Sequence, residues 1–224
     1  MTTSRLLHHT PGACSRVVLN ALEEIGLPYR EQSVAILAGA QRMPEYLAIN
    51  PKGKVPTLVD ADGVVYTELP VITYHLALAQ PEARLLPTDA SGQVPLACLS
   101  DLTWLSGTLH PIIARMFRPT SLSVADPNCV KAIAYAEMNG HAAGVSSRLE
   151  GQRWWYGDDW SITDVMLNWV FSTAGQYGFP YADFPVLAAH RERVEMRPSF
   201  IRARACEVRA RERDSLSLPS GFKL

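Results

Sequence analysis

The chain has 224 residues, of which 47% are hydrophobic and 19% charged. This composition excludes intrinsically disordered, collagen-like and coiled-coil proteins. Twenty-one Lys and Arg residues against 22 Asp and Glu residues give a formal net charge of −1. A global positive field that would hold nucleic acid or an anionic membrane is therefore excluded, and we expect neither partner.

The four cysteines lie far apart and form no C-x-x-C pair: Cys14, Cys98, Cys129 and Cys206. This spacing indicates neither a zinc site nor a disulfide framework, so we expect no bound metal and reduced thiols. Residues 1–9 lack the apolar core of a signal peptide, and no apolar stretch approaches the roughly 20 residues of a membrane span. We therefore expect a cytoplasmic protein that is neither secreted nor embedded in a membrane.

The first 80 residues predict a mixed domain of strands and helices. Short apolar runs alternate with a helical pattern and with turn residues such as Pro11-Gly12 and Gly26. The expected elements are a strand at 5–9, a helix at 17–25, a strand at 29–36, a short helix at 44–48, a hairpin of 57–60 with 64–67, and a helix at 70–79.

The character of the sequence changes after residue 80. Residues 81–92 form a polar connection, and residues 93–224 show helical periodicity without a convincing alternating strand. We expect helices at 94–117, 130–149, 162–177, 184–195 and 199–213, the third opened by a capping box from Ser161 to Asp164. The fold class predicted is therefore α+β, with domain 1–80, linker 81–92 and all-helical domain 93–224.

The segment from Pro11 to Ser15 connects the first strand to the first helix. Free amides and the positive end of the helix dipole favour an anion there, so a thiolate would be stabilised. That thiol is either Cys14 or a ligand's thiol held by the Ser15 hydroxyl; alternatively, Cys14 is a small packing residue and Ser15 only a helix cap. The first possibility makes Cys14 the one cysteine expected to ionise near neutral pH. Val17 stands where a resolving cysteine would be, which excludes dithiol redox cycling.

The loop before the hairpin is a second candidate for binding. Pro56 lies where a strand begins after a turn, a context that favours a cis peptide and would leave the Val55 backbone unpaired for an extended peptide. The alternative is a basic surface loop with Lys52 and Lys54. Glu68, just before the next helix, could grip an ammonium group or serve only as a partner of the helix dipole.

His110, followed by Pro111, is the remaining titratable candidate. An imidazole is able to donate or accept a proton near neutrality, although a single helical His also occurs as a structural residue.

Taken together, these features resemble the cytosolic glutathione transferases over essentially the whole chain. The segment from Asn50 to Leu58, the Glu at the strand end and the internal capping box occur in that family's order and spacing. The segment 11–15 and the Leu109-His110-Pro111 helix look most like the bacterial beta class and its relatives. The related zeta-class isomerases have Ser where Gly12 and Ala13 stand, so that class is not favoured.

The resemblance implies a role for each candidate residue. Cys14 would lie beside the glutathione sulfur; in the beta class, the cysteine at this place can carry glutathione as a mixed disulfide. His110 would reach the sulfur from the helical domain. The remaining implied contacts are backbone pairing of Val55 with the cysteinyl residue, a cis Pro56, Lys54 near the glycyl carboxylate and Glu68 on the γ-glutamyl ammonium.

Two departures from the family pattern affect these implied contacts. Leu69 replaces a Ser that usually binds the γ-glutamyl carboxylate, which leaves only the backbone N–H at this position. Pro111 replaces a Lys that is common after the His. A polar residue that would serve the neighbouring subunit falls near Asp101 or Thr103.

The function predicted from the sequence is a homodimeric, detoxifying glutathione transferase that activates the glutathione thiolate, with glutathione as co-substrate and no metal. The second substrate would be a small apolar electrophile or a disulfide, bound in a pocket of the helical domain. One alternative is glutathione-dependent cleavage of an ether or thioether, with Ser15 rather than Cys14 as the donor to the thiolate. Another is a non-catalytic protein of the same fold that binds a partner, for example through its arginine-rich last helix.

Overall fold

The computed structural model describes residues 4–224, so the first three residues of the expected domain 1–80 lie outside it. The chain forms two compact units. The first contains the residues up to Leu85 together with Arg197–Leu224, and the second contains Leu86–Met196. The return of the last 28 residues to the first unit differs from the division at residue 93 expected from the sequence.

The first unit is built on a mixed four-stranded sheet with the order β2-β1-β3-β4. Its strands are β1 (Arg5–His9), β2 (Tyr29–Ser33), β3 (Thr57–Val59) and β4 (Val65–Thr67). β1 pairs in parallel with β2 and antiparallel with β3, which in turn forms the expected hairpin with β4. This is the thioredoxin-like arrangement that the sequence predicts.

Besides short 3-10 helices, the N-terminal part of this unit has three α-helices: α1 (Ser15–Ile25), α2 (Pro44–Leu47) and α3 (Leu69–Ala79). α1 supplies the connection that a parallel pair of strands requires. Its apolar residues Val17, Val18 and Leu22 are almost completely buried, and Gly26 ends it with a φ of 72°. A residue other than glycine would be strained in that left-handed conformation.

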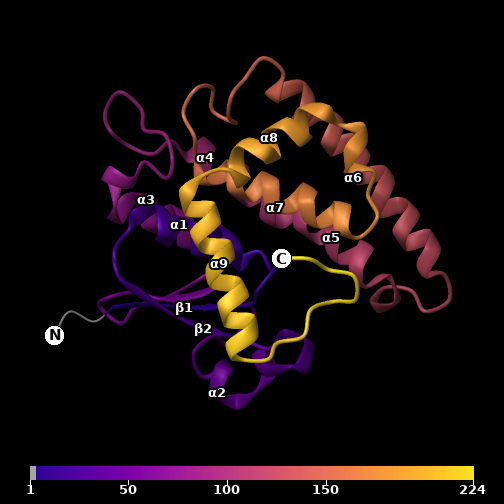
Figure 1. The fold of residues 1–224 in the computed structure, drawn as a ribbon, viewed down its shortest axis with the longest axis horizontal. Helices are drawn as coiled ribbons and strands as arrows, with labels where there is room; N and C mark the ends of the chain where they lie inside the picture. Colours follow the sequence, from indigo (N-terminus) through magenta and orange to yellow (C-terminus); the bar gives the residue numbers. More distant parts are fainter. Residues whose placement is uncertain (1–3) are drawn as a thin grey trace. The chain divides into compact units, whose positions relative to one another are not determined.

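The helix α9 (Pro198–Arg213) belongs to the first unit because it packs along α1. Figure 1 shows the yellow helix beside the indigo one. Its inner face buries Phe200, Ala203 and Ala210, and ion pairs reinforce the contact at its rim, including Arg202 with Glu23 at 2.8 Å. Helical periodicity predicted this helix, but periodicity does not specify which neighbour covers its apolar face.

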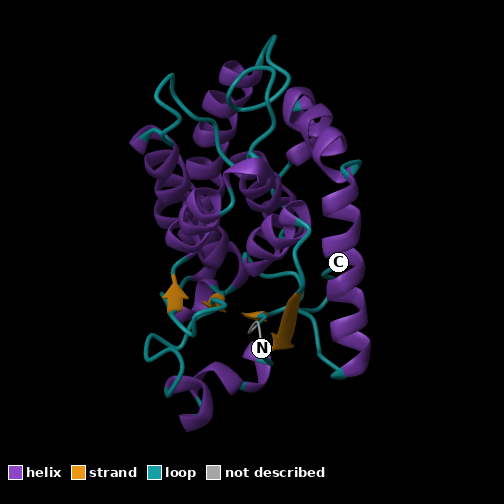
Figure 2. Cartoon of the chain, turned by 90° about the vertical axis from the view of Figure 1, so that its left-hand side faces the viewer, coloured by secondary structure: helices purple, strands orange, loops and turns teal. Residues whose placement is uncertain are grey.

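The regular elements of the second unit, residues 86–196, are helices, in agreement with the sequence, and two isolated β-bridges within residues 154–159 are its other backbone pairing; Figure 2 draws the helices of the chain in purple. Its main helices are α4 (Leu96–Trp104), α5 (His110–Phe117), α6 (Pro127–Leu149), α7 (Ile162–Gln176) and α8 (Pro185–Glu195). Within residues 4–224, no helix is both long and apolar enough to span a membrane.

The centre of the second unit is α7, which is buried from Ile162 to Ala174. The expected capping box is present: the Asp164 carboxylate accepts the Ser161 N–H at 2.9 Å. Asp164 also accepts the Trp155 N–H at 2.8 Å and lies 2.9 Å from Nε2 of the buried His190. The carboxylate therefore satisfies the helix start and ties α8 to it.

Glu31 on β2 joins the sheet to the end of α9. Its carboxylate accepts a hydrogen bond from Nε2 of the buried His9 at 2.8 Å and also pairs with Arg213. The hydrogen bond from His9 and those from Arg213 lower the pKa of Glu31 to about 2. A carboxylate whose pKa is depressed in the folded state contributes stability above its unfolded pKa and loses it as the pH falls through the folded value.

We expect this contribution to disappear between about pH 5 and pH 2. Allowing for the exposure of Arg213, the loss is about 1 to 3 kcal/mol of unfolding free energy. Urea unfolding of the protein and of Glu31→Gln across this range measures it, since the variant should lack this part of the acid slope. The exposed Glu82→Gln variant is the control. Identical slopes in the protein and in Glu31→Gln would contradict the prediction.

Candidate functional site

The loop from Pro11 to Cys14 leads from β1 directly into α1. The Ala13 N–H donates to the Thr10 carbonyl at 3.0 Å, which closes a tight turn. Gly12 adopts a φ of 82°, where an L side chain is strained. Cys14 is the N-cap residue of α1, so its side chain lies at the positive end of the helix, as the sequence predicts.

The Ser15 hydroxyl is fully engaged with the main chain. Its oxygen accepts the Thr10 N–H at 3.0 Å and its proton goes to the Thr10 carbonyl at 3.1 Å. Ser15 is completely buried and lies one residue inside the helix rather than at its cap. In this arrangement the hydroxyl has no proton to offer to a bound thiolate, which disfavours the sequence-based role of Ser15 as the donor.

The Cys14 thiol is buried and lies against the Val55 loop. Its Sγ is 3.8 Å from the Val55 carbonyl oxygen, a distance at which the thiol can donate a hydrogen bond. Burial raises the pKa of Cys14 to about 12, outweighing the helix-start amides that lower it. The Glu68 carboxylate raises the pKa further and the Lys54 ammonium lowers it. The expectation that Cys14 ionises near neutral pH is therefore wrong for the ligand-free protein, because removal from water outweighs the helix end.

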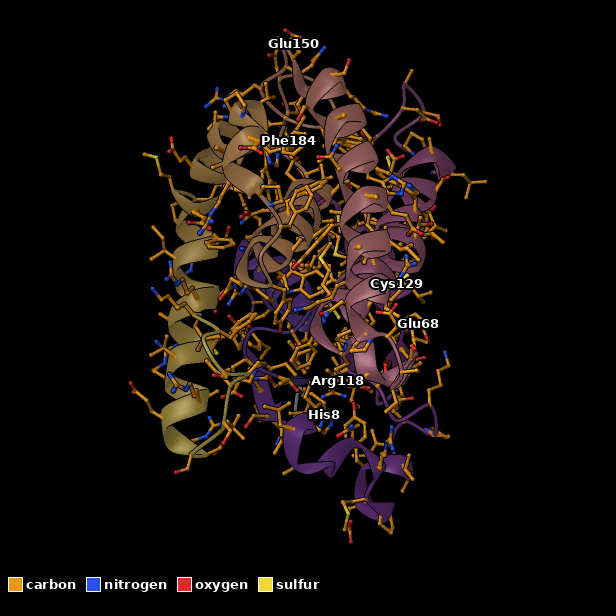
Figure 3. The ribbon with its side chains drawn as sticks, turned by 90° about the vertical axis from the view of Figure 1, so that its right-hand side faces the viewer. His8, Glu68, Arg118, Cys129, Glu150 and Phe184 are labelled. Atoms are coloured by element: carbon orange, nitrogen blue, oxygen red, sulfur yellow. The ribbon has the colours of Figure 1, made fainter. Side chains whose placement is uncertain are left out.

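The other cysteines differ in environment. Burial also raises the pKa of the Cys98 and Cys206 thiols. Cys129 is exposed on α6, where Figure 3 labels it. Among residues 4–224, no cluster of His, Cys, Asp and Glu could hold a metal ion.

The loop that carries Val55 is fixed by buried side chains. Tyr46 Oη donates to the Lys54 carbonyl at 2.6 Å, and Asn50 Nδ2 donates to the same oxygen at 2.9 Å. Asn50 also donates to Thr57 Oγ1 at 2.9 Å and accepts the Lys52 N–H at 3.1 Å. Asn50 and Thr57 are almost completely buried. The loop is therefore held in one conformation from its inner side.

The Val55-Pro56 peptide bond is cis, as predicted from the sequence. Val55 lies outside the strands, and no acceptor for its N–H is found among residues 4–224. The residue is half-buried, whereas Pro56 is buried and Lys54 exposed. This loop thus presents a backbone donor that an extended ligand could pair with.

Glu68 stands at the start of α3 with a φ of 67°. Its carboxylate is about half exposed and pairs with the Lys52 ammonium at 2.9 Å. The same ammonium donates to Thr67 Oγ1 at 2.9 Å. Glu68, labelled in Figure 3, therefore pairs with an ammonium group of the chain itself, and its role toward the ammonium group of a ligand stays a prediction.

Leu69 is the first residue of α3, and its side chain is buried. It offers no hydroxyl group to a ligand. The amides in the first turn of a helix have no partner within the helix, so the Leu69 N–H is the group that remains for an anion.

His110 belongs to the second unit and opens α5. Its N–H bonds to the Leu105 carbonyl five residues back, within a π-helical segment from Leu105 to Leu109. Pro111 explains this widening, because proline lacks an N–H and its ring clashes with the carbonyl four residues earlier. The His110 ring is half-buried and meets the edge of Trp169, with centroids 4.7 Å apart.

The two other polar candidates of the second unit differ from each other. Asp101 accepts hydrogen bonds from Trp155 Nε1 at 2.7 Å and Tyr156 Oη at 3.0 Å, whereas Thr103 is exposed. Asp101 thus has an internal structural role in the helical unit.

Most of the sequence-predicted site residues thus come together in the first unit, around Cys14 and the Val55 loop. Sequence reasoning assigned no role at this site to four residues that contact its parts. They hold the Val55 loop, hold the Gly12 N–H or pair with the Glu68 carboxylate: Tyr46, Asn50, Glu207 and Lys52. Lys52 and Asn50 lie in the segment that the motif already marked. Nothing local marked Glu207, which accepts the Gly12 N–H from 195 positions away.

The raised pKa of Cys14 predicts slow alkylation. We expect iodoacetamide to label Cys14 at least about 100-fold more slowly than the exposed Cys129 at pH 7, with a rate still rising at pH 10. Peptide mass spectrometry after timed labelling gives both rates from one sample. Preferential labelling of Cys14 at pH 7 would contradict the assignment of a neutral thiol.

The network behind the Val55 loop predicts a second measurable effect. Asn50→Ala removes one buried donor that serves two acceptors, so the unfolding free energy should fall by about 1 to 3 kcal/mol. Urea denaturation measures the loss. The exposed Asn128→Ala variant is the matched control and should change the unfolding free energy by less than about 0.5 kcal/mol. Equal stabilities of the two variants would contradict a role for Asn50 in holding the loop.

Comparison with known proteins places these features in a family. Residues 12–79 match the model of the glutathione S-transferase N-terminal domain. A maleylacetoacetate isomerase of Rhizobium meliloti (strain 1021) is 30% identical over 171 residues, which cover 75% of this chain and 68% of the relative.

Solved structures agree along almost the full length. A sphingomonad glutathione S-transferase complexed with glutathione has a TM-score of 0.80 and 28% identity, covering 91% of this chain and 98% of that one. The beta class glutathione S-transferase of Sphingomonas chungbukensis has a TM-score of 0.79 and 27% identity, with 90% and 98% covered. The chain therefore belongs to the cytosolic glutathione transferases, a family of enzymes.

Proposed function

We propose that this protein is a glutathione transferase that binds glutathione along the Val55 loop and transfers it to a small electrophilic or disulfide substrate. The observation that carries the proposal is the contact between the Cys14 thiol and the Val55 carbonyl. It places a sulfur group beside an unpaired backbone edge, so a cysteine-containing peptide pairing with Val55 would have its own sulfur next to Cys14.

The charges around this edge fit the two ends of glutathione. The γ-glutamyl ammonium would replace the Lys52 ammonium on Glu68, since the two groups have the same charge and hydrogen-bonding capacity. The carboxylate beside it would take the Leu69 N–H at the start of α3. The exposed Lys54 is suited to the glycyl carboxylate at the other end.

For the chemical step, the raised pKa of Cys14 favours a role as a hydrogen-bond donor over a role as the thiolate that forms a mixed disulfide. As a neutral thiol, Cys14 is able to donate its S–H to the glutathione thiolate and so stabilise the nucleophile that attacks the electrophile. In thiol exchange, the glutathione thiolate would attack one sulfur of a disulfide substrate and expel the other as a thiolate. A mixed disulfide on Cys14 requires loss of its proton first.

The second unit contributes to the proposal through its helices. His110 is the titratable group that we assign to activation of the sulfur, and the apolar side chains of the helical unit are assigned to the second substrate. Ether or thioether cleavage and a non-catalytic binding role would use the same glutathione-binding backbone at Val55. Measurements of turnover are therefore needed to distinguish these two functions from conjugation and thiol exchange.

A homodimer, a cytoplasmic location and a role in detoxification are part of the same proposal. On α3, Val71 and Leu78 are about half exposed and stand seven residues apart, which puts two apolar side chains on one face of the helix. Such a face is suited to a second copy of the chain. The free cysteines fit a reducing compartment.

The contact of Glu68 with the ammonium predicts the outcome of a binding experiment. In calorimetric titration with glutathione, Glu68→Gln should weaken binding by about 1 to 3 kcal/mol, because a charged acceptor is lost. Lys52→Met should leave binding equal or tighter, because a competing ammonium is removed. Asp62→Asn, in the exposed hairpin turn, is the control. Equal affinity of Glu68→Gln and the unaltered protein would remove Glu68 from the site.

Turnover of an aryl electrophile and of a disulfide, each with glutathione, tests the reaction itself. Cys14→Ala should reduce conjugation by about 10²- to 10³-fold, as for loss of one donor to a developing or bound anion. Ser15→Ala should have a smaller effect than Cys14→Ala, because the Ser15 hydroxyl is occupied by Thr10. Binding of glutathione without turnover of either substrate would favour the non-catalytic alternative.

A further inference from the structure

Glu207 on α9 is a buried carboxylate with two partners in the first unit. Its side chain has no exposed surface. One oxygen accepts the Gly12 N–H at 2.9 Å, and the other accepts Nε of Arg16 at 2.6 Å. Arg16 is itself buried in the second position of α1. The carboxylate therefore joins α9 to the loop and helix that carry Cys14.

A carboxylate without solvent contact persists only where charge and hydrogen bonds compensate its lost hydration. Arg16 supplies the charge, and Gly12 supplies a main-chain donor. If stability alone determined these positions, apolar residues of similar volume would serve equally well. The bond to Gly12 is the part that such residues could not replace, and it acts on the loop rather than on the helix.

The loop is also closely packed at Gly12. This residue has no side chain, and a Cβ built on it would lie 2.6 Å from the Phe222 ring. The neighbouring turn is closed on the other side by Ala13 N–H to the Thr10 carbonyl. The Gly12 N–H and the packing of Phe222 thus fix the segment whose next two residues end at the Cys14 thiol.

We propose that Glu207 is a positioning residue for the site: by holding the Gly12 N–H it keeps the Pro11–Cys14 loop closed and the Cys14 thiol buried against Val55. The consequence for thiol accessibility stands on the structure alone. The consequence for glutathione affinity rests on the proposed function.

Two double variants isolate the bond to Gly12. Arg16→Met with Glu207→Gln removes both buried charges and keeps an amide oxygen for the Gly12 N–H. Arg16→Met with Glu207→Met also removes both charges, with a side chain of similar length and no comparable acceptor. We expect iodoacetamide to label Cys14 about tenfold faster in the Met/Met variant than in the Met/Gln variant, because the closed loop loses a buried hydrogen bond.

The other cysteines are internal controls. Labelling of the exposed Cys129 and of the buried Cys98, both in the second unit, should be the same in the two variants. Glu212→Gln, on the exposed side of α9, should label like the unaltered protein. Equal Cys14 rates in the two double variants would overturn the proposal, and so would an increase at Cys98 that matches the increase at Cys14.

Hydrogen exchange of the unaltered protein provides a test that does not depend on folding of the variants. The Gly12 amide should exchange at least about 100-fold more slowly than an unprotected amide, since its hydrogen is bound to a buried carboxylate. Exchange at the unprotected rate would overturn the proposal.

Calorimetry with glutathione then separates this inference from the proposed function. If the unaltered protein binds glutathione, and if the two double variants have equal melting temperatures, the Met/Met variant should bind glutathione more weakly than the Met/Gln variant. Equal affinity of the two variants for glutathione would overturn the positioning role. If the unaltered protein binds none, the proposed function fails, whereas the labelling and exchange results still decide the role of Glu207.

Discussion

The turn from β1 into α1 is the constraint on which the candidate site depends, and Thr10 satisfies its polar groups. The Thr10 N–H and carbonyl both bond to the Ser15 hydroxyl, and its own hydroxyl donates to the Val34 carbonyl at 2.7 Å. Buried main-chain groups have to find partners, so this arrangement leaves little freedom in how the chain enters the helix. The same bonds direct the Ser15 hydroxyl back toward the sheet and leave Cys14 as the side chain at the helix start.

The second element of the site is rigid for a different reason. Buried side chains hold the Val55 loop through the Lys54 carbonyl, whereas the Val55 N–H itself has no acceptor among residues 4–224. A donor that is fixed and not satisfied internally costs less to bind than one on a mobile segment, since its ordering is complete before the ligand arrives. Glu68 differs from the Val55 N–H in this respect, because the Lys52 ammonium already pairs with its carboxylate and a ligand ammonium would have to displace it.

How far the sequence predicts this structure depends on how local each feature is. Turn residues and periodicity predicted the sheet, the hairpin, the cis Val55-Pro56 bond and the helices, since each depends on neighbouring residues. Strand β2 ends at Ser33 rather than at residue 36, because the chain there turns into a 3-10 helix at Ile36–Ala38. Features set by tertiary contacts were missed or wrong: the packing of α9 on α1, the acceptor of the Gly12 N–H and the pKa of Cys14. The position of Cys14 at a helix start favoured a thiolate. The burial of Cys14, which raises its pKa instead, depends on tertiary packing and cannot be predicted from a short segment of sequence.

The electrostatics of Cys14 link ligand binding to its acidity. In the free protein, burial is the largest influence on its pKa, and the Glu68 carboxylate adds to it. A ligand ammonium that replaces Lys52 on Glu68 exchanges one positive charge for another. The influence of the Glu68 carboxylate on the pKa of Cys14 therefore changes little when the ligand binds. A glutathione thiolate beside Cys14 would add a negative charge and raise the pKa further, since a like charge disfavours ionisation. Under the proposed function, Cys14 is therefore neutral when the thiolate is bound, and its proton is available to the glutathione sulfur in place of the Val55 carbonyl.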